Sequence, residues 1–179
     1  MKTIAETKNY IIRETAFADY EYFSRWEIDQ DVTKFLAYDI TRTYEDVVEE
    51  CFANKADASK TDFTIVAKAS EQPIGRIYLS RIDDHSDSMD ITKIYIGDKS
   101  LWNQGVGREV MEGLLKYLFE DMKMERVTLD YFTGNVRAAS LYKTLGFVSE
   151  GLARNACKKD DVYHDLNLMS MLREEYFAR

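Results

Sequence analysis

Apolar residues recur along this chain with two periods, one typical of helices and one typical of strands. From Val106 onward they return at about every fourth position, and charged residues occupy the opposite side. This pattern predicts the clearest helix of the chain. Further helices are predicted around Phe17, Tyr20 and Phe23, after a capping-box pattern of Thr43 and Asp46, and over 137–145, where Gly146 ends the helix.

Runs rich in β-branched and aromatic residues, separated by turn residues, predict the strands. Two of them, 63–68 and 74–82, are joined by the short segment Ser70-Glu71-Gln72-Pro73, which favours an antiparallel hairpin. The other predicted strands cover 10–14, 91–96, 126–131, 147–150 and 163–172. The resulting order, β α α β β β α β α β β, indicates an α/β (α+β) fold with a mixed sheet.

Length and composition fit one domain over residues 1–179, with a core from about 10 to 175. The chain is 45% hydrophobic and has a single proline, so neither disorder nor a linker is indicated. No apolar run is long enough to span or enter a membrane, so we expect a soluble, cytoplasmic protein without a membrane partner. The net charge of -8 would repel a nucleic acid and attract a cation, although solubility is the simpler explanation of it.

A glycine-containing segment lies between a predicted strand and the clearest helix. It reads Trp102-Asn103-Gln104-Gly105-Val106-Gly107-Arg108-Glu109. Its glycines let a ligand approach the backbone, and the free N–H groups of a first helical turn attract anions such as a pyrophosphate. A plain tight turn would have the same composition. No glycine follows three residues after Gly107, and no Lys-Ser or Lys-Thr pair follows the segment, so a dinucleotide or triphosphate site is disfavoured.

A second segment follows the next predicted strand and reads NVRAASLYKTLGF, from Asn135 to Phe147. Together the two segments resemble the cofactor-binding motifs of the GNAT superfamily of N-acetyltransferases. The resemblance runs from IIRE to LREEY, and the ending YHDLNLMSMLREEY is similar to the branch of ribosomal-protein alanine acetyltransferases, spermidine acetyltransferases and some aminoglycoside 6'-acetyltransferases. Trp102 departs from the Gln or Arg that the superfamily often has there, which removes one phosphate-contacting side chain.

The resemblance implies a mostly antiparallel mixed sheet with helices on both faces, a splayed central strand pair, and acetyl-CoA as co-substrate without a metal. Backbone N–H groups of the first segment would hold the pyrophosphate. The strand at 94–96 would bind the pantetheine arm like an added strand, with one N–H facing the oxyanion. The implied cofactor-binding residues are Ile94, Tyr95, Ile96, Gln104, Gly105, Val106, Gly107, Arg108, Glu109, Asn135, Ala138 and Tyr142.

Three residues are candidates for proton transfer in such a reaction: Tyr142, Asp90 and Glu150. The resemblance places Tyr142 near the thioester sulfur, where its phenol could protonate the departing thiolate; without the motif it would be a core aromatic. An alkylamine with a pKa of about 10.4 is mostly protonated at neutral pH, so a base or a proton-conducting water is required. Asp90 and Glu150 are the candidate bases, and each also fits a solvated charge. With only His85 and His164, at scattered positions, no histidine metal site is expected.

The expected reaction is direct acetyl transfer from acetyl-CoA to a primary amine within a ternary complex, since neither Cys51 nor Cys157 lies near the two segments. The acceptor stays open between a protein N-terminus, a polyamine and a small or antibiotic amine, and the acidity of the chain mildly favours a cationic acceptor. The rival hypothesis is a catalytically silent acetyl-CoA or CoA-binding sensor module, which would bind acetyl-CoA and release no thiol. The resemblance is also compatible with a homodimer.

Overall fold

The computed structural model describes all residues from 1 to 179, and its strands form one eight-stranded sheet. The strands are β1 (Thr3–Glu6), β2 (Tyr10–Glu14), β3 (Thr61–Ala67), β4 (Gln72–Asp83), β5 (Ser88–Ile96), β6 (Arg126–Phe132), β7 (Val148–Lys159) and β8 (Val162–Leu172). The helices are α1 (Tyr20–Glu27), α2 (Gln30–Thr33), α3 (Tyr44–Ala56), α4 (Val106–Lys116), α5 (Val136–Thr144) and α6 (Arg173–Ala178).

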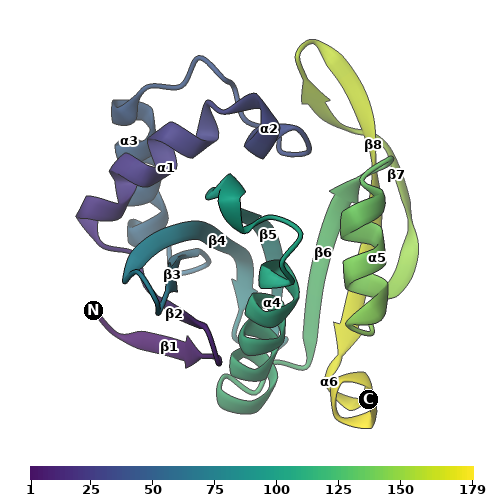
Figure 1. The fold of residues 1–179 in the computed structure, drawn as a ribbon. Helices are drawn as coiled ribbons and strands as arrows, with labels where there is room; N and C mark the ends of the chain where they lie inside the picture. The colour runs from purple at the N-terminus through teal and green to yellow at the C-terminus, as the bar shows by residue number, and fades with distance from the viewer.

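The strand order is β1-β2-β3-β4-β5-β6-β8-β7, and every neighbouring pair is antiparallel except β5 and β6. Helices α1 and α3 pack together and contact β4 and β3, whereas α4 packs on β1, β2 and β5. Figure 1 shows α4 and α5 in front of the sheet, with α1 to α3 grouped at the opposite end of the strands from α6. The predicted mixed, mostly antiparallel α/β fold is confirmed.

The main core lies between α4 and the sheet. Val110, Met111 and Leu114 are completely buried there, against apolar side chains of the strands that include Ile65 and Ile77. The prediction of this helix is therefore confirmed, because its periodic apolar residues lie on the side that packs against the sheet. No helix in the structure combines the length and the apolar content that crossing a membrane would need.

Some of the sequence predictions for helix ends and turns are confirmed, and others are not. The capping box of α3 is confirmed, because Thr43 Oγ1 accepts from Asp46 N–H at 3.2 Å and the Asp46 carboxylate accepts from Thr43 N–H at 2.7 Å. Pro73, predicted in a turn, lies inside β4 at a register irregularity opposite Val66, where its missing N–H is tolerated. The four-residue elements β1 and α2 were missed because they are too short to show a period.

The C-terminal part also differs from the sequence prediction. Strand β7 extends to Lys159, well beyond the predicted end at 150, and α6 follows β8 without a break. Most of β7 is exposed, because it is the edge strand of the sheet, and an exposed strand lacks the apolar alternation on which the prediction relied.

The two parallel strands at the centre diverge after a short paired stretch. Strand β5 pairs with β6 only over Ser88–Asp90 and Arg126–Thr128. Strand β5 also carries a bulge at Thr92, since Ile91 pairs with Leu79 and Lys93 with Tyr78, leaving one extra residue between them. A bulge bends a strand and increases its twist. The predicted splayed central pair is confirmed, and Figure 1 shows β5 and β6 separating toward α2.

Candidate active site

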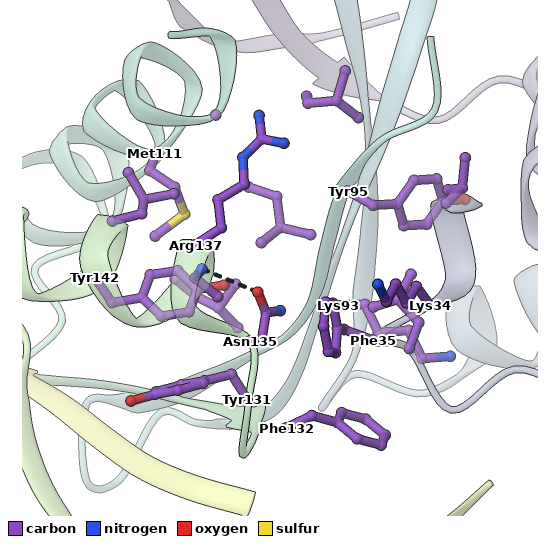
Figure 2. Close-up of a pocket in the computed structure, with 18 of the residues that line it drawn as sticks. Lys34, Phe35, Lys93, Tyr95, Met111, Tyr131, Phe132, Asn135, Arg137 and Tyr142 are labelled. Atoms are coloured by element: carbon purple, nitrogen blue, oxygen red, sulfur yellow. Dashed lines mark hydrogen bonds between the residues drawn. The ribbon is translucent and has the colours of Figure 1, made fainter. Parts of the chain in front are cut away.

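A cavity of about 820 Å³ lies in the cleft between β5 and β6. It is lined by β5 and β6, the turn before α4, the start of α5, the segment after α2, and the β7–β8 hairpin. Twenty of its 31 lining residues are hydrophobic, a composition typical of sites that bind small molecules and cofactors. Figure 2 shows Tyr131, Tyr142 and Met111 on one side of the view and Lys34, Phe35 and Tyr95 on the other.

The turn before α4 presents a row of backbone donors. Gly105 precedes the helix with a φ of 80°, in the left-handed region that favours glycine. The N–H groups of Arg108 and Glu109 both donate to the Gly105 carbonyl oxygen at 3.1 Å, so two of the predicted pyrophosphate donors are used within the first turn. The N–H groups of residues 104–107 donate to no acceptor of the chain. Four donors at the N-terminus of an 11-residue helix fit a pyrophosphate.

Space and charge at this turn fit the same ligand. A Cβ atom built at Gly107 would meet only Leu141 Cδ2, at 3.7 Å, so packing of the protein does not demand a glycine there. Arg108 and Arg137 line the cavity and place two cations within it. These features together fit the phosphate end of coenzyme A.

Two predicted residues of this segment have side chains outside the cavity lining. The Gln104 amide donates to the Ser100 carbonyl oxygen at 2.7 Å. The Glu109 carboxylate accepts from the backbone N–H of Asn9 at 2.7 Å and from its side-chain amide at 2.9 Å. Glu109 therefore connects α4 to the β1–β2 turn.

The predicted residues of β5 all line the cavity, but their side chains pack on opposite faces of the sheet. Ile94 and Ile96 pack against the main core, whereas Tyr95 belongs to a second apolar cluster on the other face and donates to Glu27 Oε1 at 2.9 Å. Trp102 Nε1 donates to the Ile96 carbonyl oxygen at 2.8 Å. Beyond Asp90, β5 has no strand partner on its cleft side, so an amide-containing arm can bind there as an added strand.

Asn135 lines the cavity and also begins α5. Its Oδ1 accepts from the Ala138 N–H at 3.1 Å, the bond drawn as a dashed line in Figure 2. This cap uses the carbonyl oxygen of the side chain and leaves the amide NH₂ group for a ligand. Ala138 lines the cavity beside it.

Tyr142 lines the cavity from α5 and is almost completely buried. Its ring centroid lies 5.9 Å from those of Tyr131 and of Phe147. Burial, followed by the charge of Asp130 and by Tyr131, raises the pKa of Tyr142 to about 12. The hydroxyl group therefore stays protonated at any physiological pH and is available as a donor.

The two predicted bases lie in different settings, neither of them in the cavity lining. Asp90 is 4% exposed, and its carboxylate accepts from Thr92 Oγ1 at 2.8 Å and from Thr128 Oγ1 at 2.7 Å, at the last paired position of β5 and β6. Glu150 on β7 accepts from Arg126 at 2.5 and 2.7 Å, and this partner lowers the pKa of the Glu150 carboxyl group. We do not carry Glu150 forward as a base, because the Arg126 ion pair holds it outside the cavity.

Sequence reasoning missed several residues that line the cavity. Phe35, Lys93, Phe132 and Asp130 are among them, and none belongs to either motif. Cys157 corrects an expectation, because it also lines the cavity from β7. Burial, followed by the charge of Asp130, raises the pKa of the Cys157 thiol, which disfavours the nucleophilic thiolate.

The sequence and the fold were also compared with those of known proteins. Residues 9–148 match the family model described as "Acetyltransferase (GNAT) domain". The chain is similar to the uncharacterised N-acetyltransferase p20 of Bacillus licheniformis, at 24% identity over 95% of this chain and 96% of the relative. It is also similar to the uncharacterised N-acetyltransferase YnaD of Bacillus subtilis, at 23% identity over 95% and 97%. A solved spermidine N-acetyltransferase from Vibrio cholerae, in complex with CoA and spermine, superposes with a TM-score of 0.85 at 20% identity, over 94% of this chain and 98% of that one.

Proposed function

Because this chain belongs to the GNAT family of acetyltransferases, we propose that its β5–β6 cavity holds acetyl-CoA along β5 and receives a primary amine from the α2 side. Family membership establishes the predicted class, an enzyme that transfers an acetyl group from acetyl-CoA to an amine. Nothing found supports the silent sensor module. The placement of the two substrates, the roles of single residues and the kind of amine are our proposals.

One observation carries the placement of acetyl-CoA. The unpaired N–H groups of residues 105–107 lie at one part of the cavity, and the free edge of β5 runs along it. The N–H groups would hold the pyrophosphate, with Arg108 and Arg137 supplying cationic side chains. The amides of the pantetheine arm would pair with the β5 edge, as a peptide strand does. A backbone N–H of that edge would then stabilise the oxyanion that forms when the amine attacks.

Tyr142 would act as a hydrogen-bond donor to the leaving sulfur. With a pKa of about 12 for Tyr142 and about 8.5 for a free thiol, full proton transfer to the thiolate is uphill by about 5 kcal/mol. A hydrogen bond to the developing thiolate carries no such cost and is strongest when the sulfur becomes charged. We therefore assign Tyr142 the stabilisation of the leaving group, with water supplying the final proton.

The acceptor end favours an amine with an apolar body over a polyamine. Its charged lining residues are Lys34, Lys93, Asp31 and Asp130, and Asp31 is paired with Lys99 at 3.0 Å. Because two lysines and two carboxylates line this end, the net charge of -8 is not concentrated there, and a polyamine with several positive charges is not favoured. The aromatic side chains here fit an apolar side chain next to the reacting nitrogen.

Release of free CoA thiol from acetyl-CoA, measured over a panel of amines, tests the proposal. The panel would contain spermidine, dipeptides with apolar or charged first residues, and phenethylamine as a small aromatic amine. We expect the highest kcat/KM for the apolar peptides and the aromatic amine. A strong preference for spermidine would contradict the proposed acceptor class, and binding of acetyl-CoA without thiol release for any amine would contradict transfer itself.

A further inference from the structure

Asp130 is a carboxylate that neither motif contains, yet it lines the cavity from β6. Its neighbours Leu129 and Tyr131 face the main core, and because side chains alternate along a strand, Asp130 lies on the other face. Lys93 and Tyr95 lie on that same face, in contact with the aromatic ring of Tyr38. This is the face of the cleft that α2 and its following segment cover, where the acceptor is proposed to enter.

The surroundings of Asp130 separate it from the other candidate carboxylates. Asp90 accepts from two threonine hydroxyl groups and lies 3.9 Å from the Arg81 guanidinium group, whereas the Asp130 side chain has no hydrogen-bond or ion-pair partner within the chain. Burial, followed by the negative charge of Asp90, raises the pKa of Asp130, and Arg81 opposes the shift. A half-buried carboxylate without a partner is ready to bind a cationic or hydrogen-bond-donating ligand.

The titratable groups around Asp130 come from four elements. Asp90 on β5 and Arg81 on β4 act on it from one side. Tyr142 on α5 and Cys157 on β7 are close enough for the Asp130 charge to raise the pKa of each. Asp130 therefore lines the same cavity as Tyr142, the proposed leaving-group donor.

On the basis of the proposed function, we propose that the Asp130 carboxylate binds the acceptor amine and accepts a proton from its nitrogen during acetyl transfer. The nitrogen lone pair forms the new bond to the acetyl carbon, and the carbon–sulfur bond breaks. The sulfur keeps the electron pair, stabilised by the Tyr142 hydroxyl group, and takes a proton from water. One N–H proton passes to Asp130 and from there to water, so the products are an acetamide and free CoA.

This step needs a base because attack makes the nitrogen cationic. The N–H proton becomes more acidic as the carbon–nitrogen bond forms, so a carboxylate can remove it at that stage although it could not efficiently deprotonate a free alkylammonium ion. The same carboxylate attracts the protonated amine by charge, and the amine loses one proton to water before its lone pair attacks the acetyl carbon. Asp130 would therefore be a catalytic residue that touches the reacting nitrogen.

The test compares Asp130→Asn with the wild-type enzyme from pH 6 to pH 10, using the best amine of the panel. We expect kcat/KM for the amine to fall by about 10²-fold or more near pH 7. The deficit should narrow toward pH 10, because hydroxide then removes the N–H proton of the cationic nitrogen in place of Asp130. Asp130→Glu should restore part of the rate. Acetyl-CoA affinity, measured by titration calorimetry, should stay near the wild-type value in both variants.

Asp84→Asn is the matched control, because Asp84 is an exposed residue of the β4–β5 hairpin outside the cavity, and it should keep the wild-type rate and pH profile. A wild-type rate and pH profile for Asp130→Asn would overturn the assignment. A loss of equal size at every pH, together with weaker acetyl-CoA binding, would also overturn it, since that pattern indicates a structural role. If the wild-type enzyme transfers acetyl to no amine of the panel, the proposed function itself is contradicted. This result is obtained before any Asp130 variant is compared, so the two failures are distinguishable.

Discussion

Replacing Arg76 with methionine should destabilise the fold severely, although Arg76 lies outside the cavity. Arg76 is 0% exposed, and its guanidinium group donates to Asp62 at 2.7 and 2.9 Å and to Glu27 at 2.6 Å. It also lies over the ring of Phe23, 4.9 Å from the centroid. Methionine keeps the apolar stem of the side chain and removes only the charge and its donors.

The size of the effect follows from what the substitution leaves behind. The side chains of Glu27 and Asp62 are 0% and 2% exposed, so each would lose its main buried counter-charge. Removing one partner of a buried ion pair costs about 3–5 kcal/mol. A domain of this size has a total stability of about 5–15 kcal/mol. With about 2–4 °C lost per kcal/mol, the melting temperature should fall by about 6–20 °C.

Urea unfolding followed by circular dichroism, together with calorimetric melting, measures this loss. Arg25→Met is the matched control, because Arg25 pairs with Glu21 but both side chains are more than 60% exposed. The control should change stability by no more than about 0.5 kcal/mol. Adding Glu27→Gln to Arg76→Met should recover part of the loss, since it removes a stranded charge. If Arg76→Met lost no more stability than Arg25→Met, the reasoning about the buried charge cluster would be refuted.

Three further predictions concern the site and the N-terminal half. Tyr142→Phe keeps the ring and deletes the hydroxyl group, so kcat should fall by about 10²-fold or more while acetyl-CoA affinity changes little. A kcat near the wild-type value would show that Tyr142 contributes only packing. Gly107→Asp places a carboxylate beside the unpaired N–H groups of residues 104–107, so it should greatly weaken acetyl-CoA binding while the protein stays folded. Titration calorimetry measures this affinity, and an unchanged value would contradict the pyrophosphate site. Burial opposes the shift, but hydrogen bonds from Arg13, the Ala16 N–H group and Thr64 hold the pKa of Asp19 below its ordinary value. The stabilising contribution of the Asp19 carboxylate should be complete above the unfolded-state pKa of about 3.9 and disappear as pH falls through the lower folded-state pKa. The difference in unfolding free energy between wild type and Asp19→Asn at pH 7 should therefore close below about pH 4. A constant difference down to about pH 2 would contradict this linkage.

The proposed phosphate end of the site could be predicted from sequence, because contiguous backbone groups and local geometry form the turn that carries it. Gly105, Gly107 and the periodic helix after them are contiguous, and the same few residues set the turn and supply the donors. Even there, the use of the Arg108 and Glu109 N–H groups within the first turn required the structure. A helical period does not reveal at which residue the hydrogen bonding of the first turn begins.

The acceptor end could not be predicted, because it is assembled from distant segments. Phe35, Lys93, Asp130 and Cys157 come from four parts of the chain and share no spacing. In the sequence, Asp130 is one charged residue in the buried strand Arg126–Phe132, and Glu150 in the next strand looks equally suitable. The structure separates them, because Asp130 lines the cavity and has no partner, whereas Glu150 lies outside the lining and pairs with Arg126.

The bulge at Thr92 decides which side chains of β5 face each side of the sheet. In a regular strand Ile91 and Ile94 would face opposite sides, yet both contact the main core, because the extra residue shifts the alternation by one position. The shift leaves Lys93 and Tyr95 on the acceptor face while Ile94 and Ile96 stay on the core face. The adjacent polar residues Thr92 and Lys93, which interrupt the apolar alternation between Ile91 and Ile94, are the sequence signal of this bulge. The bulge also bends β5 just beyond Asp90, where the pairing with β6 ends and the free edge proposed to bind acetyl-CoA begins.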